Sequence, residues 1–118
     1  MIFNKTRKTK IIAKSKVISA SWDRLRGLMF EDTKKFDYGL VFMLDSESKI
    51  GASVHMMFVF FAIDIIFLDS KRKIVDVAEN LQPFTPNYTP KKAAKYFIEL
   101  PAGKAKGTRI GDEIEWKE

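Results

Sequence analysis

The sequence predicts a mainly β, single-domain fold of the sandwich or barrel type. We expect a jelly-roll-like arrangement of about seven or more short strands with one or two short helices. Short apolar segments alternate with turn-forming segments along the chain, and the longest apolar segment runs into a clear hairpin. The length of 118 residues is the usual size of one domain. We therefore treat residues 1–118 as a single domain.

The first strand is expected at Lys8–Ala13, inside a strongly basic segment. Residues 1–16 contain six Lys or Arg side chains and no acid, which accounts for the whole net charge of +6. Such a segment can be an electrostatic footprint for nucleic acid or another anionic surface. It can also be an edge strand whose lysines discourage pairing with other chains. We favour the edge strand, because residues 10–14 have the character of a strand.

A short helix and a strand are expected next. Ser21 can cap a helix whose apolar stripe consists of Trp22, Leu25, Leu28 and Met29. The apolar segment Gly39–Leu44 predicts a strand, and the polar segment Asp45–Gly51 predicts a turn.

The run Met56–Leu68 contains one polar residue, Asp64, among thirteen. It is too short to cross a bilayer, which requires about 20 apolar residues. The whole segment Ala52–Leu68 is too long for one typical strand, so we predict two buried strands with a break near Phe61–Ala62. The second of these strands continues through a turn at residues 69–72 into the strand Lys73–Ala78, which completes a hairpin.

The C-terminal part is predicted to contain a loop and two strands. Prolines at 83, 86 and 90 exclude a regular central strand from Leu81–Pro90, a segment that also carries Phe84 and Tyr88. The following elements are a strand at Lys95–Leu100, an irregular segment from Pro101, a turn at Gly111-Asp112 and a closing strand at Glu113–Trp116.

The composition excludes several kinds of site. The chain has no Cys, which excludes disulfides, zinc thiolate sites and Cys nucleophiles. A single His excludes multi-histidine metal sites and leaves little for a His-based catalytic triad. We therefore expect no metal and no cofactor. The N-terminus lacks an apolar segment of signal-peptide length, so we expect a soluble cytoplasmic protein without a membrane partner.

Five short segments, taken in order, resemble one family. They are Arg26-Gly27-Leu28-Met29, the apolar run ending at Asp69, Ile74-Val75, Glu99-Leu100-Pro101-Ala102-Gly103 and Gly111-Asp112. Their order and spacing are similar to those of a prokaryotic family filed as domain of unknown function 192, from about Lys8 to Trp116. The resemblance implies a compact jelly-roll-like β-sandwich with short helices, and no established activity.

The chain differs from that family's pattern before Asp64. Members usually carry Lys or Arg, often Asn and Thr, in this stretch, and a Pro two residues before the Asp. Here residues 57–63 are all apolar. If the family's polar residues line a pocket, this chain lacks part of it.

Asp64 is the first candidate site residue. An ionised carboxylate in so apolar a run requires partners, because burying it unpaired costs several kcal/mol. A structural carboxylate would accept backbone N–H groups at a bulge or pair with an arginine. Arg26 is the expected partner and Arg24 the second choice, because a guanidinium group suits bidentate pairing. The functional alternative is a pocket acid.

The other candidates are His55, Met56, Phe84, Tyr88 and Glu99. We expect His55 to be a core or rim residue rather than a catalytic base. Met56 and the apolar residues after it could line an adaptable pocket, but plain core is the favoured interpretation. Glu99 is expected to be a rim residue paired with Lys or Arg, and the alternative is a carboxylate pair with Asp64.

We expect a binding module without catalysis, for an unidentified ligand or protein partner. Its site would lie near Arg26, the segment His55–Met57, and the loop bearing Phe84 and Tyr88. Nucleic-acid binding through residues 1–16 and 91–109 is the alternative. An enzyme using His55, Asp64 and Glu99 is the third hypothesis.

Overall fold

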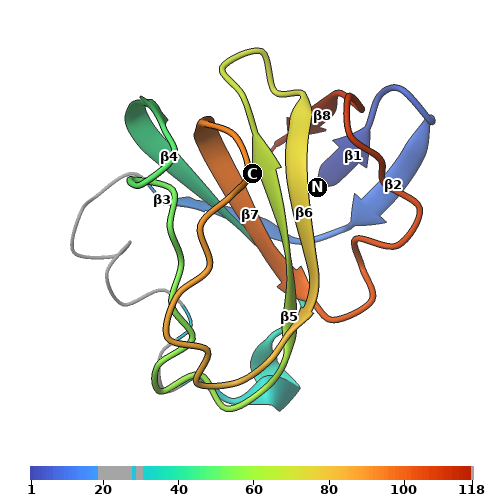
Figure 1. Cartoon of the computed structure of the whole chain (residues 1–118). Helices are drawn as coiled ribbons and strands as arrows, with labels where there is room; N and C mark the ends of the chain where they lie inside the picture. Colours follow the sequence, from blue (N-terminus) through green and yellow to red (C-terminus); the bar gives the residue numbers. More distant parts are fainter. Residues whose placement is uncertain (19–27, 29–30, 118) are drawn as a thin grey trace.

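The computed structural model describes residues 1–18, 28 and 31–117, and in this part eight strands form two sheets. The smaller sheet, in the order β2-β1-β8, consists of β1 (Ile2–Asn4), β2 (Thr9–Ile12) and β8 (Ile114–Trp116). The larger sheet, in the order β3-β4-β7-β5-β6, consists of β3 (Ser15–Ile18), β4 (Gly39–Ser48), β5 (Ile63–Leu68), β6 (Ile74–Leu81) and β7 (Ala94–Pro101). A 3₁₀ turn, η1, spans Thr33–Lys35. The prediction of a mainly β fold of seven or more short strands is confirmed (Figure 1).

The strand β5 is the most deeply buried element, with all six residues inside the protein. It pairs antiparallel with β6 on one side and with β7 on the other, so its backbone is satisfied along both edges. Successive side chains alternate between the two faces of the larger sheet, and each face is covered by its own apolar core. The predicted hairpin from β5 into β6 is therefore correct, and its continuous apolar sequence reflects burial on both faces.

One core lies between the two sheets. Ile2 and Ile12 from the smaller sheet pack with Ile98 and Leu100 from β7. The sheets approach closely at Gly39, where any Cβ would overlap the Ile2 side chain. Glycine at the start of β4 therefore lets the Ile2 side chain pack there without shifting.

The other core is covered by loops, and here one prediction is wrong. The first of the two strands predicted within Ala52–Leu68 does not form, because residues 52–62 cross the sheet as a loop with a single bridge from Val54 to Tyr88. The physical reason lies in the segment it faces: prolines at 83, 86 and 90 lack the N–H groups that a longer ladder requires.

The basic N-terminal segment forms three short strands rather than one. β2 is an edge of the smaller sheet, and β3 is an edge of the larger sheet, where it pairs in parallel with β4. The predicted edge position is therefore confirmed. β4 also extends to Ser48, beyond the predicted end at Leu44, and the turn follows at residues 49–52. The predicted helix at 22–29 lies outside the described residues except for Leu28.

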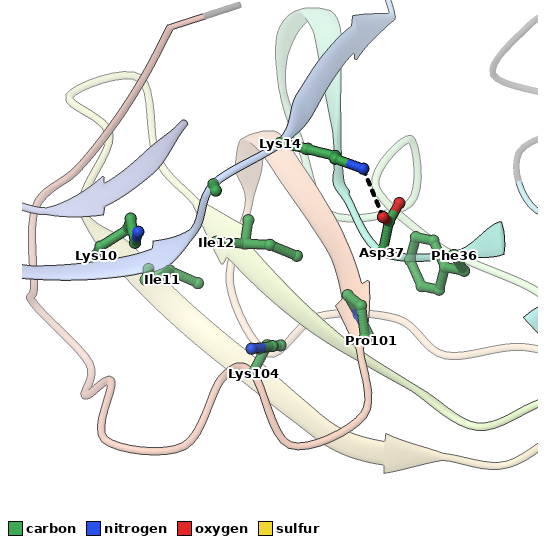
Figure 2. A pocket seen from close by; sticks show the side chains of 9 residues that line it. Lys10, Ile11, Ile12, Lys14, Phe36, Asp37, Pro101 and Lys104 are labelled. Atoms are coloured by element: carbon green, nitrogen blue, oxygen red, sulfur yellow. Dashed lines mark hydrogen bonds and ion pairs between the residues drawn. The ribbon is translucent and has the colours of Figure 1, made fainter. Parts of the chain in front are cut away.

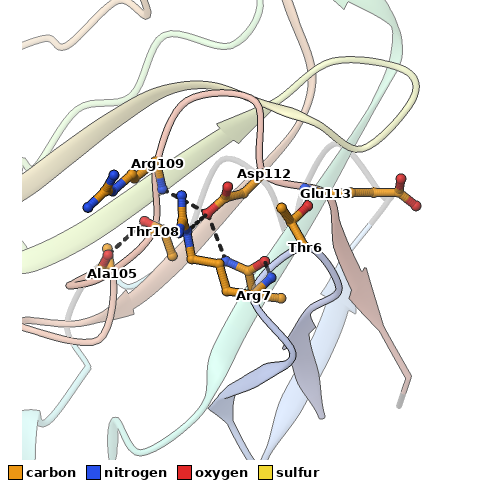
Figure 3. A network of polar contacts seen from close by, with 8 residues as sticks. Thr6, Arg7, Ala105, Thr108, Arg109, Asp112 and Glu113 are labelled. Atoms are coloured by element: carbon orange, nitrogen blue, oxygen red, sulfur yellow. Dashed lines mark hydrogen bonds and ion pairs between the residues drawn. The ribbon is translucent and has the colours of Figure 1, made fainter.

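A polar network around Asp112 ties the hairpin of β1 and β2 to the loop before β8 (Figure 3). One carboxylate oxygen of the buried Asp112 accepts hydrogen bonds from the Asn4 side chain at 3.0 Å, Arg7 Nε at 2.8 Å and the Arg109 backbone N–H at 3.0 Å. Burial acts to raise the pKa of Asp112, but these hydrogen bonds outweigh it and hold the pKa below its usual value. The network therefore joins the N-terminal and C-terminal segments that form the smaller sheet.

Within the described ranges, no helix has the length and apolar character needed to cross a membrane.

Candidate functional site

Four large apolar side chains gather on the surface where two loops meet. They are Met57, Phe58, Phe60 and Phe84, with 38%, 44%, 59% and 41% of their area exposed. The Phe84 ring lies edge-on to Phe60, with centroids 5.3 Å apart, and to Phe58 at 6.1 Å. We call these four residues the aromatic surface. A contiguous exposed apolar patch of this kind marks interaction sites more often than isolated apolar side chains do.

The backbone of Met56 holds the two loops together beneath this surface. Its N–H donates to the Thr85 carbonyl at 2.7 Å, and its carbonyl accepts from the N–H groups of Phe84 at 2.8 Å and Val59 at 3.1 Å. The Met56 side chain is fully buried in the core below. In Figure 1 the same two loops, before β5 and after β6, run next to each other at one end of the sheet. The aromatic surface therefore rests on a hydrogen-bonded support.

Two residues of the aromatic surface adopt a backbone conformation that bulky side chains rarely adopt. Phe58 has φ of 59° and Phe84 has φ of 62°, both in the left-handed region. This conformation costs roughly 1–2 kcal/mol for a residue with a Cβ. At both positions a half-exposed ring points outward, although glycine would adopt this backbone conformation at a lower free-energy cost. Backbone strain of this kind is found preferentially at binding and catalytic sites.

The surroundings of the aromatic surface carry no formal charge in the sequence. Neither 52–62 nor 81–90 contains Asp, Glu, Lys or Arg, although 31% of the whole chain is charged. His55 is exposed at the edge, and its Nδ1 accepts a hydrogen bond from the Met57 N–H at 3.2 Å. The two loops that carry the aromatic surface therefore contribute no formal charge to it.

Tyr88 supports the loop from behind. Its ring stacks on Phe67 of β5 with centroids 5.6 Å apart, and its hydroxyl donates to Asp76 of β6 at 2.7 Å. Burial, followed by the hydrogen bond and the negative charge of Asp76, raises the pKa of Tyr88 to about 12. Tyr88 therefore stays neutral at physiological pH and fixes the loop to the sheet.

Asp64 is a structural carboxylate in this protein. Its Oδ1 accepts the N–H of Asn80 at 2.8 Å, and its Oδ2 accepts the N–H groups of Gly103 and Ala105, both at 2.9 Å. Asn80 lies at an irregularity of the β5–β6 pairing and has φ of 53°. These are the backbone partners that the structural interpretation expects at a bulge. Arg26, the other expected partner, lies outside the described residues.

Glu99 is not the rim residue that we predicted. It is 95% buried in β7, and burial raises its pKa to about 8. Glu99 pairs with Ile65 in the sheet register, whereas Asp64 pairs with Leu100. Because successive side chains point to opposite faces, Asp64 and Glu99 lie on opposite sides of the sheet and form no carboxylate pair. Among the described residues, Glu99 Oε1 has no hydrogen-bond partner.

A family model settles the relationship of the chain to known proteins. The model of domain of unknown function 192 (DUF192), described as "Uncharacterized ACR", matches residues 2–116. The chain belongs to the DUF192 family.

Relatives of this DUF192 chain carry the name UPF0127 protein. A UPF0127 protein of Thermococcus sibiricus is 42% identical over 99% of this chain and 75% of its own length. Another, from Pyrococcus horikoshii, is 39% identical over 98% of both chains. Among solved structures, a protein of unknown function from Novosphingobium aromaticivorans superposes with a TM-score of 0.75 at 23% identity, covering 86% of this chain and 74% of that one.

A second solved structure, titled a putative transcription regulator, comes from Sinorhizobium meliloti. It superposes with a TM-score of 0.77 at 24% identity and covers 86% of this chain and 79% of that one. At this identity, the two solved structures support the fold and nothing finer.

In this DUF192 chain, the structure brings together four of the predicted site residues: His55, Met56, Phe84 and Tyr88. Asp64 and Glu99 belong to the strands of the larger sheet. Met57 lies within the predicted site segment His55–Met57, whereas Phe58 and Phe60 were favoured as core and are exposed. The prolines in the facing segment were the available indication, because they leave residues 56–61 without a strand partner.

Proposed function

We propose that the protein is a non-catalytic binding module whose aromatic surface docks a protein partner that presents apolar side chains. The observation that carries this proposal is the pair Phe58 and Phe84. Both hold half-exposed rings on left-handed backbone, and the two rings meet edge to face. Because 44% of Phe58 and 41% of Phe84 stays exposed, folding gains only part of what burying these rings can contribute, and a partner that covers them would gain the rest.

The composition of the aromatic surface fits the centre of a protein interface. Aromatic residues and Met are enriched in interface cores, and charged residues are depleted there. Both conditions hold for the facing segments 52–62 and 81–90. A surface that inserts into membranes usually surrounds its apolar residues with Lys and Arg, which these two segments lack. The absence of membrane binding and a cytoplasmic location are accordingly part of the proposal.

The hydrogen bonds of Met56 support high affinity because they fix the loops before a partner arrives. A preformed surface loses little conformational freedom on binding, so more of its contact energy appears as affinity. Half-exposed rings on such a support are suited to act as anchors for pockets in a partner.

The candidate catalytic residues argue for binding without chemistry. Asp64 and Glu99 lie on opposite faces of the larger sheet, and His55 is exposed on the loop formed by residues 52–62. General acid–base chemistry requires groups within hydrogen-bond reach of a common substrate atom. Asp64 has its oxygens committed to three backbone N–H groups, which leaves it a structural task.

The alternative of nucleic-acid binding has weaker support. Three of the six basic residues in 1–16 are in ion pairs: Lys5 with Glu113, Arg7 with Asp112 and Lys14 with Asp37. A cation paired with a carboxylate contributes less to phosphate neutralisation than a free one.

Selection from a phage-displayed peptide library tests the proposed function. We expect the selected peptides to be rich in Leu, Ile, Phe or Trp, and to bind at least tenfold more weakly to a Phe60→Ser, Phe84→Ser double variant. Ile110→Ser is the matched control, because Ile110 is 61% exposed and lies in the loop before β8. Peptides that bind the double variant as well as the wild type would contradict the proposal. Sedimentation of the wild type with anionic vesicles, lost in the double variant, would point to a membrane instead.

A further inference from the structure

We propose that a second site, a groove between the N-terminal hairpin and the loop after β7, binds a small organic anion with an apolar body, such as a medium-chain carboxylate. The groove encloses about 540 Å³ and includes Lys10, Ile12, Phe36, Pro101 and Lys104 in its lining (Figure 2). This volume falls within the roughly 300–1,000 Å³ of typical small-molecule sites. The groove is separate from the aromatic surface, with which it shares no residue.

The body of the groove is apolar. Ile11 and Ile12 come from β2, Phe36 follows η1, and Pro101 ends β7. Ile12 and Phe36 are nearly buried in the two packed cores and form a fixed floor, whereas the half-buried Ile11 and Pro101 offer more apolar surface to the groove. A hydrocarbon chain laid against these side chains would remove apolar surface of both partners from water.

The free positive charge of the groove comes from two opposite walls. Lys10 lies on β2, and Lys104 lies in the loop after β7. Among the ion pairs of the described residues, none includes Lys10 or Lys104, whereas Lys14 is neutralised by Asp37 at 2.7 Å. In Figure 2 the Lys14–Asp37 pair lies at one end of the groove and Lys10 and Lys104 lie away from it. An anionic head group is therefore expected between Lys10 and Lys104.

Asp64 fixes the wall that carries Lys104. Its Oδ2 accepts the N–H groups of Gly103 and Ala105, the residues immediately before and after Lys104. Gly103 has φ of 92°, which a residue with a side chain would not readily adopt. The buried carboxylate thus holds the backbone of Lys104 at a defined place beside the groove.

The charge pattern favours a small organic anion over nucleic acid. A nucleic-acid strand presents a row of phosphates, and its binding groove requires a track of cations with aromatic rings for stacking. Within the described residues, this groove has two lysines outside any ion pair, and the Lys14–Asp37 pair at its end adds no net charge that would extend a track of cations. Phe36, its one aromatic residue, is only 6% exposed.

Titration of the ¹⁵N-labelled protein with octanoate, followed by NMR, tests the proposal. We expect chemical-shift changes at the backbone N–H groups of residues 10–14 and 102–105, and at least tenfold weaker binding in a Lys10→Glu, Lys104→Glu double variant. Octanamide, which keeps the hydrocarbon chain and lacks the charge, should bind at least tenfold more weakly than octanoate. Lys106→Glu is the matched control, because Lys106 is exposed in the same loop and does not line the groove.

Three outcomes would overturn the groove assignment. One is no octanoate binding to the wild type at millimolar concentration, and another is equal binding of octanoate and octanamide. The third is tight, strongly salt-dependent binding of a short single-stranded oligonucleotide that is lost in the double variant. The Phe60→Ser, Phe84→Ser variant should bind octanoate normally. Octanoate binding that requires those phenylalanines would place the ligand on the aromatic surface and contradict the groove assignment. Peptide binding tests the aromatic surface independently of the groove.

Discussion

The Tyr88 hydroxyl donates a 2.7 Å hydrogen bond to the Asp76 carboxylate and thereby fastens the Pro-rich loop to β6. Asp76 is 2% exposed and also accepts the N–H groups of Val77 and Lys91. Hydrogen bonds to a charged group are among the stronger ones in proteins. This contact is therefore a principal link between the loop beneath the aromatic surface and the sheet.

Tyr88→Phe should lower the free energy of unfolding by about 1.5–3 kcal/mol, because it removes the hydroxyl donor from a buried carboxylate. Urea denaturation measures the change. A double-mutant cycle with Asp76→Ala, which removes the acceptor, should give a coupling energy of at least about 1 kcal/mol. Additive effects of the two substitutions would show that the hydrogen bond contributes nothing to stability.

Asp64→Ala should lower the free energy of unfolding by about 3–5 kcal/mol, because three backbone N–H groups lose their acceptor. Thermal denaturation is a sufficient measurement. Asp45→Ala, at an exposed position of β4, is the control and should change stability by less than about 0.5 kcal/mol. A variant at Asp64 that melts like the wild type would contradict the structural role.

Glu99 should make the protein less stable as pH rises from about 5 to 8. Its pKa is raised from 4.5 to about 8 by burial, so the folded state retains a proton that the unfolded state has already lost. Stability from this group is fully present below the unfolded pKa and is lost as pH rises through the folded pKa, by about 5 kcal/mol in all. Urea denaturation of the wild type and of Glu99→Gln across this range measures the difference. Parallel pH profiles of the two proteins would show that Glu99 does not titrate in this way.

Glycine should be tolerated better than alanine at Phe84 and less well at Phe60. Phe84 has a positive φ, where glycine avoids a cost of about 1 kcal/mol that alanine incurs, whereas Phe60 does not have a positive φ. Chemical denaturation of the four variants gives the difference in unfolding free energy between glycine and alanine at each position. Both variants at a position lack the ring, so its loss cancels in that difference. The same sign at both positions would contradict the left-handed conformation of Phe84.

Much of the larger sheet could be predicted from sequence because its signals are local. The apolar residues of β5, the polar turn at 69–72 and the strand after it are adjacent, so pattern and turn chemistry identify the hairpin. The short strands β1 and β3 were not predicted. The candidate site was predicted in part: the two loops were paired correctly, but the exposed residues in them were not distinguished from the core.

The sequence by itself determined the β class, the hairpin, the loop rich in proline and the need of Asp64 for buried partners. Only the tertiary structure decided which partners those are, since two of them lie 39 and 41 residues away along the chain. It also decided that Met56 turns inward while Met57, Phe58 and Phe60 turn outward. That outcome depends on the φ of Phe58 and on hydrogen bonds between Met56 and the distant residues Phe84 and Thr85. An apolar side chain is more stable when it is buried, but in a loop the hydrogen-bond partners of the backbone determine which side chains face the core.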